Sequence, residues 1–162
     1  MLELPHAIRR LVKDRHVVVL CVGSNSGDDA AGPILYKLVR SKLNNIKIFL
    51  GGSAPEKSLS QITACKPDTV IMVNAVDRKL LPGDVVIEDL REHHASFPLM
   101  HKFPLSLLAQ LIALDLGEST EIKLVGLQAK KLYGRVSRQV SETAANLARA
   151  LIECDGLAKE AG

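Results

Sequence analysis

Two adjacent carboxylates follow a short glycine-containing loop near the start of the chain, in the stretch CVGSNSGDDAAG from Cys21 to Gly32. In many α/β proteins a loop at such a place, between an apolar run and a helix, holds phosphate against the positive end of the helix. This loop contains no lysine, and Asp28 and Asp29 would repel an anion. The dinucleotide pattern GxGxxG and a phosphate-loop ending GKS or GKT are absent from it. The pair therefore favours a cation as ligand.

A carboxylate at a helix N-terminus also has a purely structural use, because it can accept hydrogen bonds from backbone N–H groups that lack helical partners. One of the two carboxylates can serve in this way, which leaves the other for a ligand. We interpret Asp28 as the structural residue and Asp29 as the residue that faces a cation.

Three further polar residues extend this chemistry. Asn74 ends an apolar run, Asp77 follows it, and His101 lies in LMHKFPL. Each has a structural alternative: a buried amide for Asn74, the first residue of a turn for Asp77, and a surface-loop histidine for His101. A carboxylate, an amide or second carboxylate, and an imidazole form a donor set that suits nickel or zinc. These residues share no local ligand motif, so only the fold can bring them together.

Apolar runs alternate with helical patterns along the chain, which predicts a three-layer α/β/α sandwich with helices on both faces of a mostly parallel, twisted sheet of about five strands. In such sheets, ligands bind beyond the carboxyl ends of the strands. Gly51 and Gly52 are expected to stop the second strand. The predicted strands are 16–22, 46–50, 69–76, 85–89 and 121–128, and the predicted helices are 6–13, 30–43, 53–65, 104–114 and 137–153.

The composition limits the classes of function. The 162 residues, of which 47% are hydrophobic, fit one domain, with a lead-in helix in residues 1–15 and a core over 16–155. The net charge of +3 is spread along the chain and aromatic residues make up 3%, which argues against nucleic-acid binding. No apolar run reaches membrane-spanning length, and the charged N-terminus is unlike a secretory signal. We expect a cytoplasmic protein without membrane insertion.

Five segments together resemble a known family. The segments VGSNSGDDAAGP, GGSAPE, VNAVDRKLLPGDVVIED, MHKFPL and VGLQ occur in this order between Val17 and Gln128. They resemble the nickel–iron (NiFe) hydrogenase maturation endopeptidases, most closely the type that processes hydrogenase 3 large subunits. GGSAPE and LLPGDVVIED make this resemblance far more specific than a glycine loop alone.

The resemblance implies an activity and a site. Members of the family remove a C-terminal peptide from the hydrogenase large-subunit precursor after nickel insertion, and they use the nickel of the substrate for recognition. Carried over, the metal ligands and catalytic residues are Asp29, Asn74 and His101, and Gly51, Gly52 and Asp77 contact the substrate. The implied cofactor is nickel supplied by the precursor, or another divalent metal in the isolated protein.

Asn74 departs from the family pattern, which has an aspartate at this position. An amide oxygen can ligate a metal, but it brings no negative charge and is a poor general base. Three interpretations follow: an active protease in which Asn74 still ligates or Asp77 replaces it, a homologue that binds the nickel-loaded precursor without cleaving it, as a chaperone or checkpoint, or an inactivated variant. A metal-free α/β binding module also fits the composition. Cys21 lies within a predicted strand without a basic neighbour, which argues against a cysteine protease.

Overall fold

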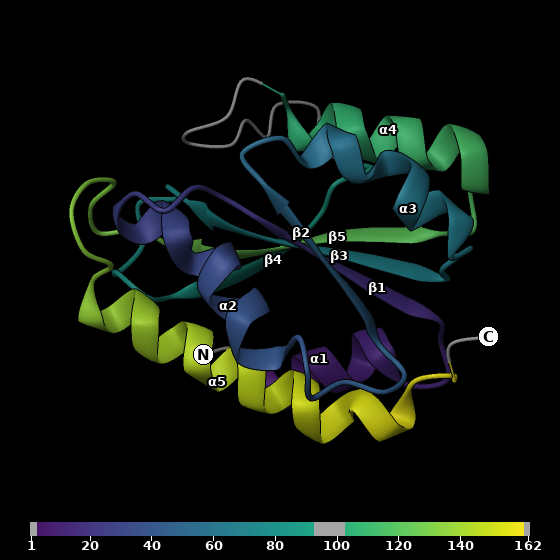
Figure 1. The fold of residues 1–162 in the computed structure, drawn as a ribbon, viewed down its shortest axis with the longest axis horizontal. Helices are drawn as coiled ribbons and strands as arrows, with labels where there is room; N and C mark the ends of the chain where they lie inside the picture. Colours follow the sequence, from purple (N-terminus) through teal and green to yellow (C-terminus); the bar gives the residue numbers. More distant parts are fainter. Residues whose placement is uncertain (1–2, 93–102, 161–162) are drawn as a thin grey trace.

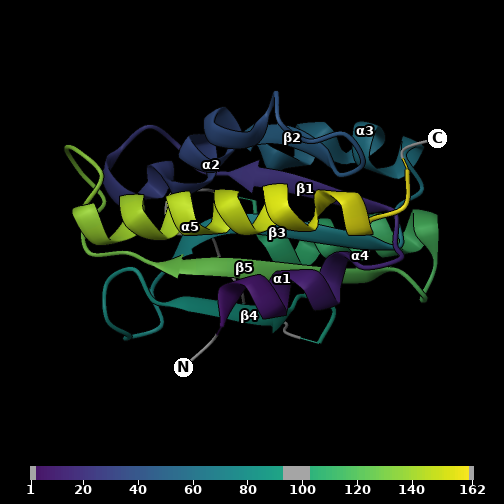
Figure 2. The ribbon, with the colours of Figure 1, turned by 90° about the horizontal axis from the view of Figure 1, so that it is seen from below.

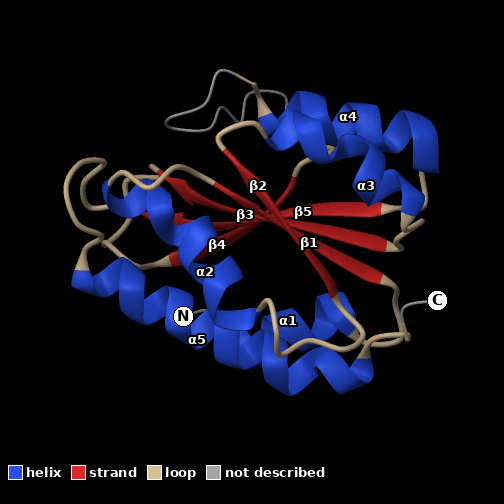
Figure 3. Cartoon of the chain, viewed as in Figure 1, coloured by secondary structure: helices blue, strands red, loops and turns tan. Residues whose placement is uncertain are grey.

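The computed structural model describes residues 3–92 and 103–160. Their strands form one sheet in the order β2-β1-β3-β5-β4, in which β4 at one edge is antiparallel and the other strands are parallel (Figures 1 and 3). The predicted α/β sandwich is confirmed. The strands are β1 Val17–Val22, β2 Lys47–Gly52, β3 Thr69–Val76, β4 Val85–Asp89 and β5 Glu121–Gln128. The helices are α1 Leu4–Val12, α2 Ala31–Val39, α3 Leu59–Ala64, α4 Leu105–Leu116 and α5 Arg138–Cys154, with short 3₁₀ turns η1 Gly27–Ala30, η2 Pro55–Ser58 and η3 Asp155–Leu157.

Helices cover both faces of the sheet. Helices α3 and α4 lie on one face, and α1, α2 and α5 lie on the other, where α5 crosses beneath the strands (Figures 1 and 2). Among the described residues, no helix is long and apolar enough to cross a bilayer.

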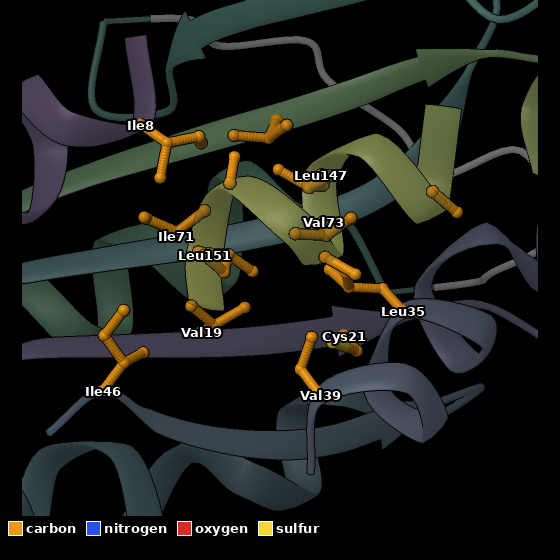
Figure 4. Close-up of a cluster of buried hydrophobic side chains, with 14 of the residues drawn as sticks. Ile8, Val19, Cys21, Leu35, Val39, Ile46, Ile71, Val73, Leu147 and Leu151 are labelled. Atoms are coloured by element: carbon orange, nitrogen blue, oxygen red, sulfur yellow. The ribbon is translucent and has the colours of Figure 1, made fainter. Parts of the chain in front are cut away.

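The central strand β3 is buried along its whole length and its side chains alternate between the two faces. Ile71 and Val73 enter the core beneath α1, α2 and α5, which Figure 4 shows with its neighbours. Val70, Met72 and Val76 enter the core beneath α3 and α4. Asn74 is an even number of residues from each of these three, so its side chain lies on the same face of the sheet, the one covered by α3 and α4.

The order of connections creates a natural ligand site. The chain leaves β1 through α2 on one face to reach β2, and leaves β2 through α3 on the other face to reach β3, on the opposite side of β1. In open α/β sheets, ligands bind at the carboxyl ends of the neighbouring strands where the strand order reverses, which here are β1 and β3. Asp29 follows β1 and Asn74 lies near the end of β3, so both lie at the edge of the sheet where this rule places a ligand.

Several predicted boundaries are wrong, among them the start of the helix predicted over 53–65, because the 3₁₀ turn η2 precedes α3, which begins only at Leu59. Strand β2 does not stop before Gly51 and Gly52 but includes them, because the carbonyl of Gly52 accepts a hydrogen bond of 2.9 Å from the N–H of Gly23 and extends the pairing with β1. Helix α2 ends at Val39, before the predicted residue 43. The chain after it is held instead by the carboxylate of Asp155, which accepts hydrogen bonds from the N–H groups of residues 44, 45 and 46.

Candidate active site

Asp29 is fully buried in the 3₁₀ turn η1, directly after the glycine loop. Its Oδ2 accepts a hydrogen bond of 2.8 Å from the N–H of Ser24, whereas its Oδ1 has no partner among the described residues. The backbone of Gly23 lies against Asp29, with φ at +139°, and a Cβ there would lie 2.0 Å from the carbonyl oxygen of Asp29. Gly23 therefore lets the loop close tightly enough to hold one carboxylate oxygen of Asp29 while the other stays available.

Asp28 is the opposite case. Its carboxylate accepts hydrogen bonds from the N–H groups of Lys130, Lys131 and Ser137, at 2.7, 3.1 and 2.6 Å, and from the hydroxyl of Ser137 at 2.9 Å. Burial by itself raises the pKa of Asp28, but these hydrogen bonds outweigh it and hold the pKa below its usual range. The structural interpretation of Asp28 is thus supported, and its function is to fix the loop after β5.

Asp28→Asn is expected to lower the free energy of unfolding at pH 7 by about 3 kcal/mol, because an amide cannot accept all of these hydrogen bonds and carries no charge. Since the pKa of Asp28 is lowered in the folded protein, its stabilisation is complete above the unfolded pKa of about 3.9 and is lost as the pH falls through the folded value. Urea unfolding at pH 7 and pH 3 should therefore show a smaller difference between the two proteins at pH 3. A difference that does not shrink would contradict this account.

Asn74 is 1% exposed, and its Oδ1 also lacks a hydrogen-bond partner among the described residues. Its register partner on β5 is Gly126, so no side chain flanks it on that side. The structural alternative, a buried amide oxygen that accepts from loop backbone, finds no such bond in the described part of the chain. An unpartnered buried oxygen costs about 1–3 kcal/mol, which is a reason to look for a ligand.

A third buried side-chain oxygen also lacks a hydrogen-bond partner, and it is not predicted from the sequence. It is Oε2 of Glu56 in η2, the turn that follows β2. Within residues 3–92 and 103–160, these three oxygens are the only buried side-chain nitrogen or oxygen atoms without a hydrogen-bond partner. The signal in the sequence is GGSAPE, where an acidic residue follows a glycine pair at the predicted ligand edge of the sheet. The helical pattern of residues 53–65 obscures this signal, because it gives Glu56 a place in the first turn of a predicted helix.

The other predicted site residues divide as follows. His101 lies outside the described residues. Asp77 is exposed; its carboxylate accepts hydrogen bonds from the backbone and side chain of Lys79 and from the amide of Gln128, and these hold its pKa below the usual range. A Cβ added to Gly51 would lie 3.0 Å from a side-chain carbon of Leu20, so packing already explains this glycine.

Gly52 is different, because its surroundings are open. It has a φ of +58°, and the nearest atom to a Cβ placed on it would be the carbonyl oxygen of Gly23, 4.0 Å away. A glycine is therefore required here by the backbone conformation and not by crowding. The backbone at this edge of the sheet is left uncovered at Gly52, and such an opening would allow another chain to approach closely.

The chemistry of this edge depends on oxygen atoms and not on a thiol. Cys21 is fully buried in β1, and its burial raises the pKa of the thiol far above the usual range, so it cannot serve as a thiolate nucleophile at neutral pH. No group of three or more His, Cys, Asp or Glu side chains in the described ranges is arranged to hold a metal ion. The unpartnered oxygens of Asp29 and Asn74 nevertheless fit a divalent cation that brings other ligands of its own.

The sequence and the fold of the chain resemble those of known proteins. No protein-family model matches the chain. The chain is 36% identical over 104 residues to the hydrogenase 3 maturation protease of Escherichia coli K12, an alignment that covers 62% of this chain and 67% of that protein. The crystal structure of the NiFe hydrogenase maturation protease HycI from Thermococcus kodakarensis superposes with a TM-score of 0.82 at 24% identity, over 93% of this chain and 99% of that one. The solution structure of the endopeptidase HycI from Escherichia coli gives a TM-score of 0.69 at 28% identity, over 90% and 93% of the two chains.

The fold defines the protein as an α/β protein with the architecture seen in a NiFe hydrogenase maturation protease. The chain belongs to the hydrogenase maturation protease family, and the resemblance found in the sequence is confirmed.

Proposed function

We propose that the protein is an endopeptidase that removes the C-terminal peptide from a nickel-loaded NiFe-hydrogenase large-subunit precursor. The observation that carries this proposal is the pair of buried, unpartnered oxygens on Asp29 and Asn74. These residues lie at the carboxyl ends of β1 and β3, where the strand order reverses, in a fold shared with maturation proteases. The precursor is the partner, the nickel arrives with it, and the reaction takes place in the cytoplasm.

In this proposal the nickel of the precursor is part of the substrate and is held by the precursor's own cysteines. The Oδ1 atoms of Asp29 and Asn74 and the imidazole of His101 recognise it. These contacts hold the scissile peptide at the edge of the sheet, which lowers the entropic cost of reaching the reactive geometry. The charge of Asp29 also attracts the nickel ion, and this attraction is stronger at a buried carboxylate than it would be in water.

Three further residues have supporting roles. The backbone at Gly51 and Gly52 lets the extended C-terminal segment of the precursor lie beside β2. Asp77 is engaged with Lys79 and Gln128, so it shapes the turn after β3 and contacts the substrate from the rim. Its engagement makes it a poor replacement for the carboxylate that Asn74 lacks.

A second candidate function is favoured by Asn74 itself. A neutral amide binds a divalent ion less tightly than a carboxylate does and activates water poorly. A homologue with this substitution would recognise the nickel-loaded precursor and hold it as a chaperone or checkpoint, without cleaving it.

The two functions are separated by one incubation. The purified protein is mixed with a nickel-loaded precursor that keeps its C-terminal extension, and the mass of the precursor is followed over time. Loss of the extension is expected, and a nickel-free precursor should stay intact. A stable complex without any loss of mass would contradict the endopeptidase proposal and favour the checkpoint. Cleavage of both precursors at the same rate would contradict the role of nickel.

A further inference from the structure

We propose that Glu56 supplies the second carboxylate of the site and faces the nickel-bearing segment of the precursor, where it provides the negative charge that Asn74 lacks. The inference rests on the proposed function for the identity of the ligand. It starts from the observation that Oε2 of Glu56 is buried and has no hydrogen-bond partner. The same is true of Oδ1 of Asp29 and Oδ1 of Asn74.

The three residues follow or end three neighbouring strands of the sheet. Strand β1 lies between β2 and β3, and all three are parallel, so their carboxyl ends meet at one edge. The bond from the N–H of Gly23 to the carbonyl of Gly52 joins the loop of Asp29 to the end of β2. Glu56 comes four residues later, in the 3₁₀ turn η2, which stays in contact with β2.

Glu56 and Asn74 also belong to the same layer of the molecule. The turn η2 leads directly into α3, and Ile62 of α3 packs into the core together with Met72 of β3. Met72 and Asn74 lie on the same face of β3, as the alternation along the strand requires. Helix α3, into which this turn leads, therefore covers the face of the sheet to which Asn74 belongs (Figure 1).

Glu56 lies in the first turn of η2, a position that favours a carboxylate, but this position provides no hydrogen-bond partner for Oε2. The ion pairs of the described residues do not include it, and its neighbour Lys57 is exposed. A buried carboxylate oxygen without a hydrogen-bond partner lowers the stability of the folded protein. A residue that only packed against the end of β2 would therefore stabilise the fold more if its side chain were neutral. The side chain as a whole is half-buried, whereas its Oε2 is buried.

The electrostatic consequence is a site with two negative charges. With Asn74 neutral, Asp29 alone would oppose a divalent ion with one charge. Glu56 raises this to two, so the site keeps the charge that the aspartate of the family pattern would have provided, now placed at the end of β2 instead of β3.

The test is the affinity of the purified protein for Ni²⁺ alone, measured by isothermal titration calorimetry. Glu56→Gln keeps the size of the side chain and removes its charge, and we expect at least a tenfold weaker affinity. Asn74→Asp in the Glu56→Gln background should recover most of it. Glu153→Gln, an exposed carboxylate at the far end of α5, is the matched control and should bind as the wild type does. Equal affinities for the wild type and Glu56→Gln, or no Ni²⁺ binding by any variant, would overturn the inference.

Thermal unfolding separates a ligand-binding role from a structural one. Without metal, Glu56→Gln should be at least as stable as the wild type, because an unpartnered charge has been removed, and its Tm should rise less when Ni²⁺ is added. A metal-free Tm several degrees below that of the wild type would indicate a structural role and overturn the inference. Its failure is distinct from that of the proposed function, because wild-type cleavage of the precursor is measured independently.

Discussion

Asp29→Asn is expected to slow removal of the C-terminal extension by about 100-fold or more, with a change in Tm of only a few degrees. The asparagine oxygen can still accept the hydrogen bond from the N–H of Ser24, so the loop keeps its shape. What is lost is the charge on the unpartnered Oδ1, which in a buried site contributes far more than it would in water. The measurement is the initial rate of mass loss of the precursor, together with thermal unfolding followed by circular dichroism.

The control for this variant is Asp115→Asn. Asp115 is exposed on α4, so the same change of charge there should leave both the rate and the Tm unaltered. If Asp29→Asn cleaves the precursor at the wild-type rate, Asp29 is not part of the site. A large fall in Tm would instead assign Asp29 a structural role like that of Asp28.

Asn74→Asp is expected to tighten the binding of Ni²⁺ by about tenfold and to accelerate cleavage, because one more carboxylate then opposes the divalent ion. The same change should lower the Tm in the absence of metal. Asn74 is buried at the edge of the sheet that Asp29 and Glu56 share, and another carboxylate there is desolvated and repelled by their charges. Addition of Ni²⁺ should reverse the order of the Tm values of the variant and the wild type.

This variant also distinguishes the two candidate functions. If the wild type binds the nickel-loaded precursor without cleaving it, and Asn74→Asp cleaves it, then Asn74 is what makes the protein a checkpoint. If cleavage by the variant is no faster than by the wild type, while Ni²⁺ binds more tightly, the amide at this position does not limit the reaction. Asn74→Leu, which removes the oxygen and keeps the branching of the side chain at Cγ, should weaken Ni²⁺ binding relative to the wild type.

The strands are predictable to a degree that the helices are not. The predicted bounds of β3, β4 and β5 agree with the structure residue by residue, because each is a β-branched or apolar run between turn residues. The predicted end of α2 is four residues late. The helical pattern continues beyond Val39, but the N–H groups of residues 44–46 donate hydrogen bonds to the carboxylate of Asp155, which lies more than 100 positions further along the chain. A local pattern contains no sign of such a partner.

The candidate site is predictable only where a fold rule can be applied. Asp29 and Asn74 are found because parallel strands gather their carboxyl ends at one edge of the sheet. The difference between Asp28 and Asp29 also follows from the sequence, although the partners of Asp28 do not. Glu56 is not predicted from the sequence, because what distinguishes it is a buried oxygen without a hydrogen-bond partner. Burial and hydrogen bonding of a single atom can be known only from the structure.

The contact between Asp28 and Ser137 has a consequence for the order of events during synthesis. These residues are 109 positions apart, so the glycine loop emerges from the ribosome long before the groups that anchor it. At about 5–20 residues per second, that delay is about 5–20 s. Until α5 begins, Asp28 is a free carboxylate beside Asp29 and the two compete for any cation or N–H donor nearby. The glycine loop of a nascent chain is therefore not anchored through Asp28 until residues 130–137 have been synthesised.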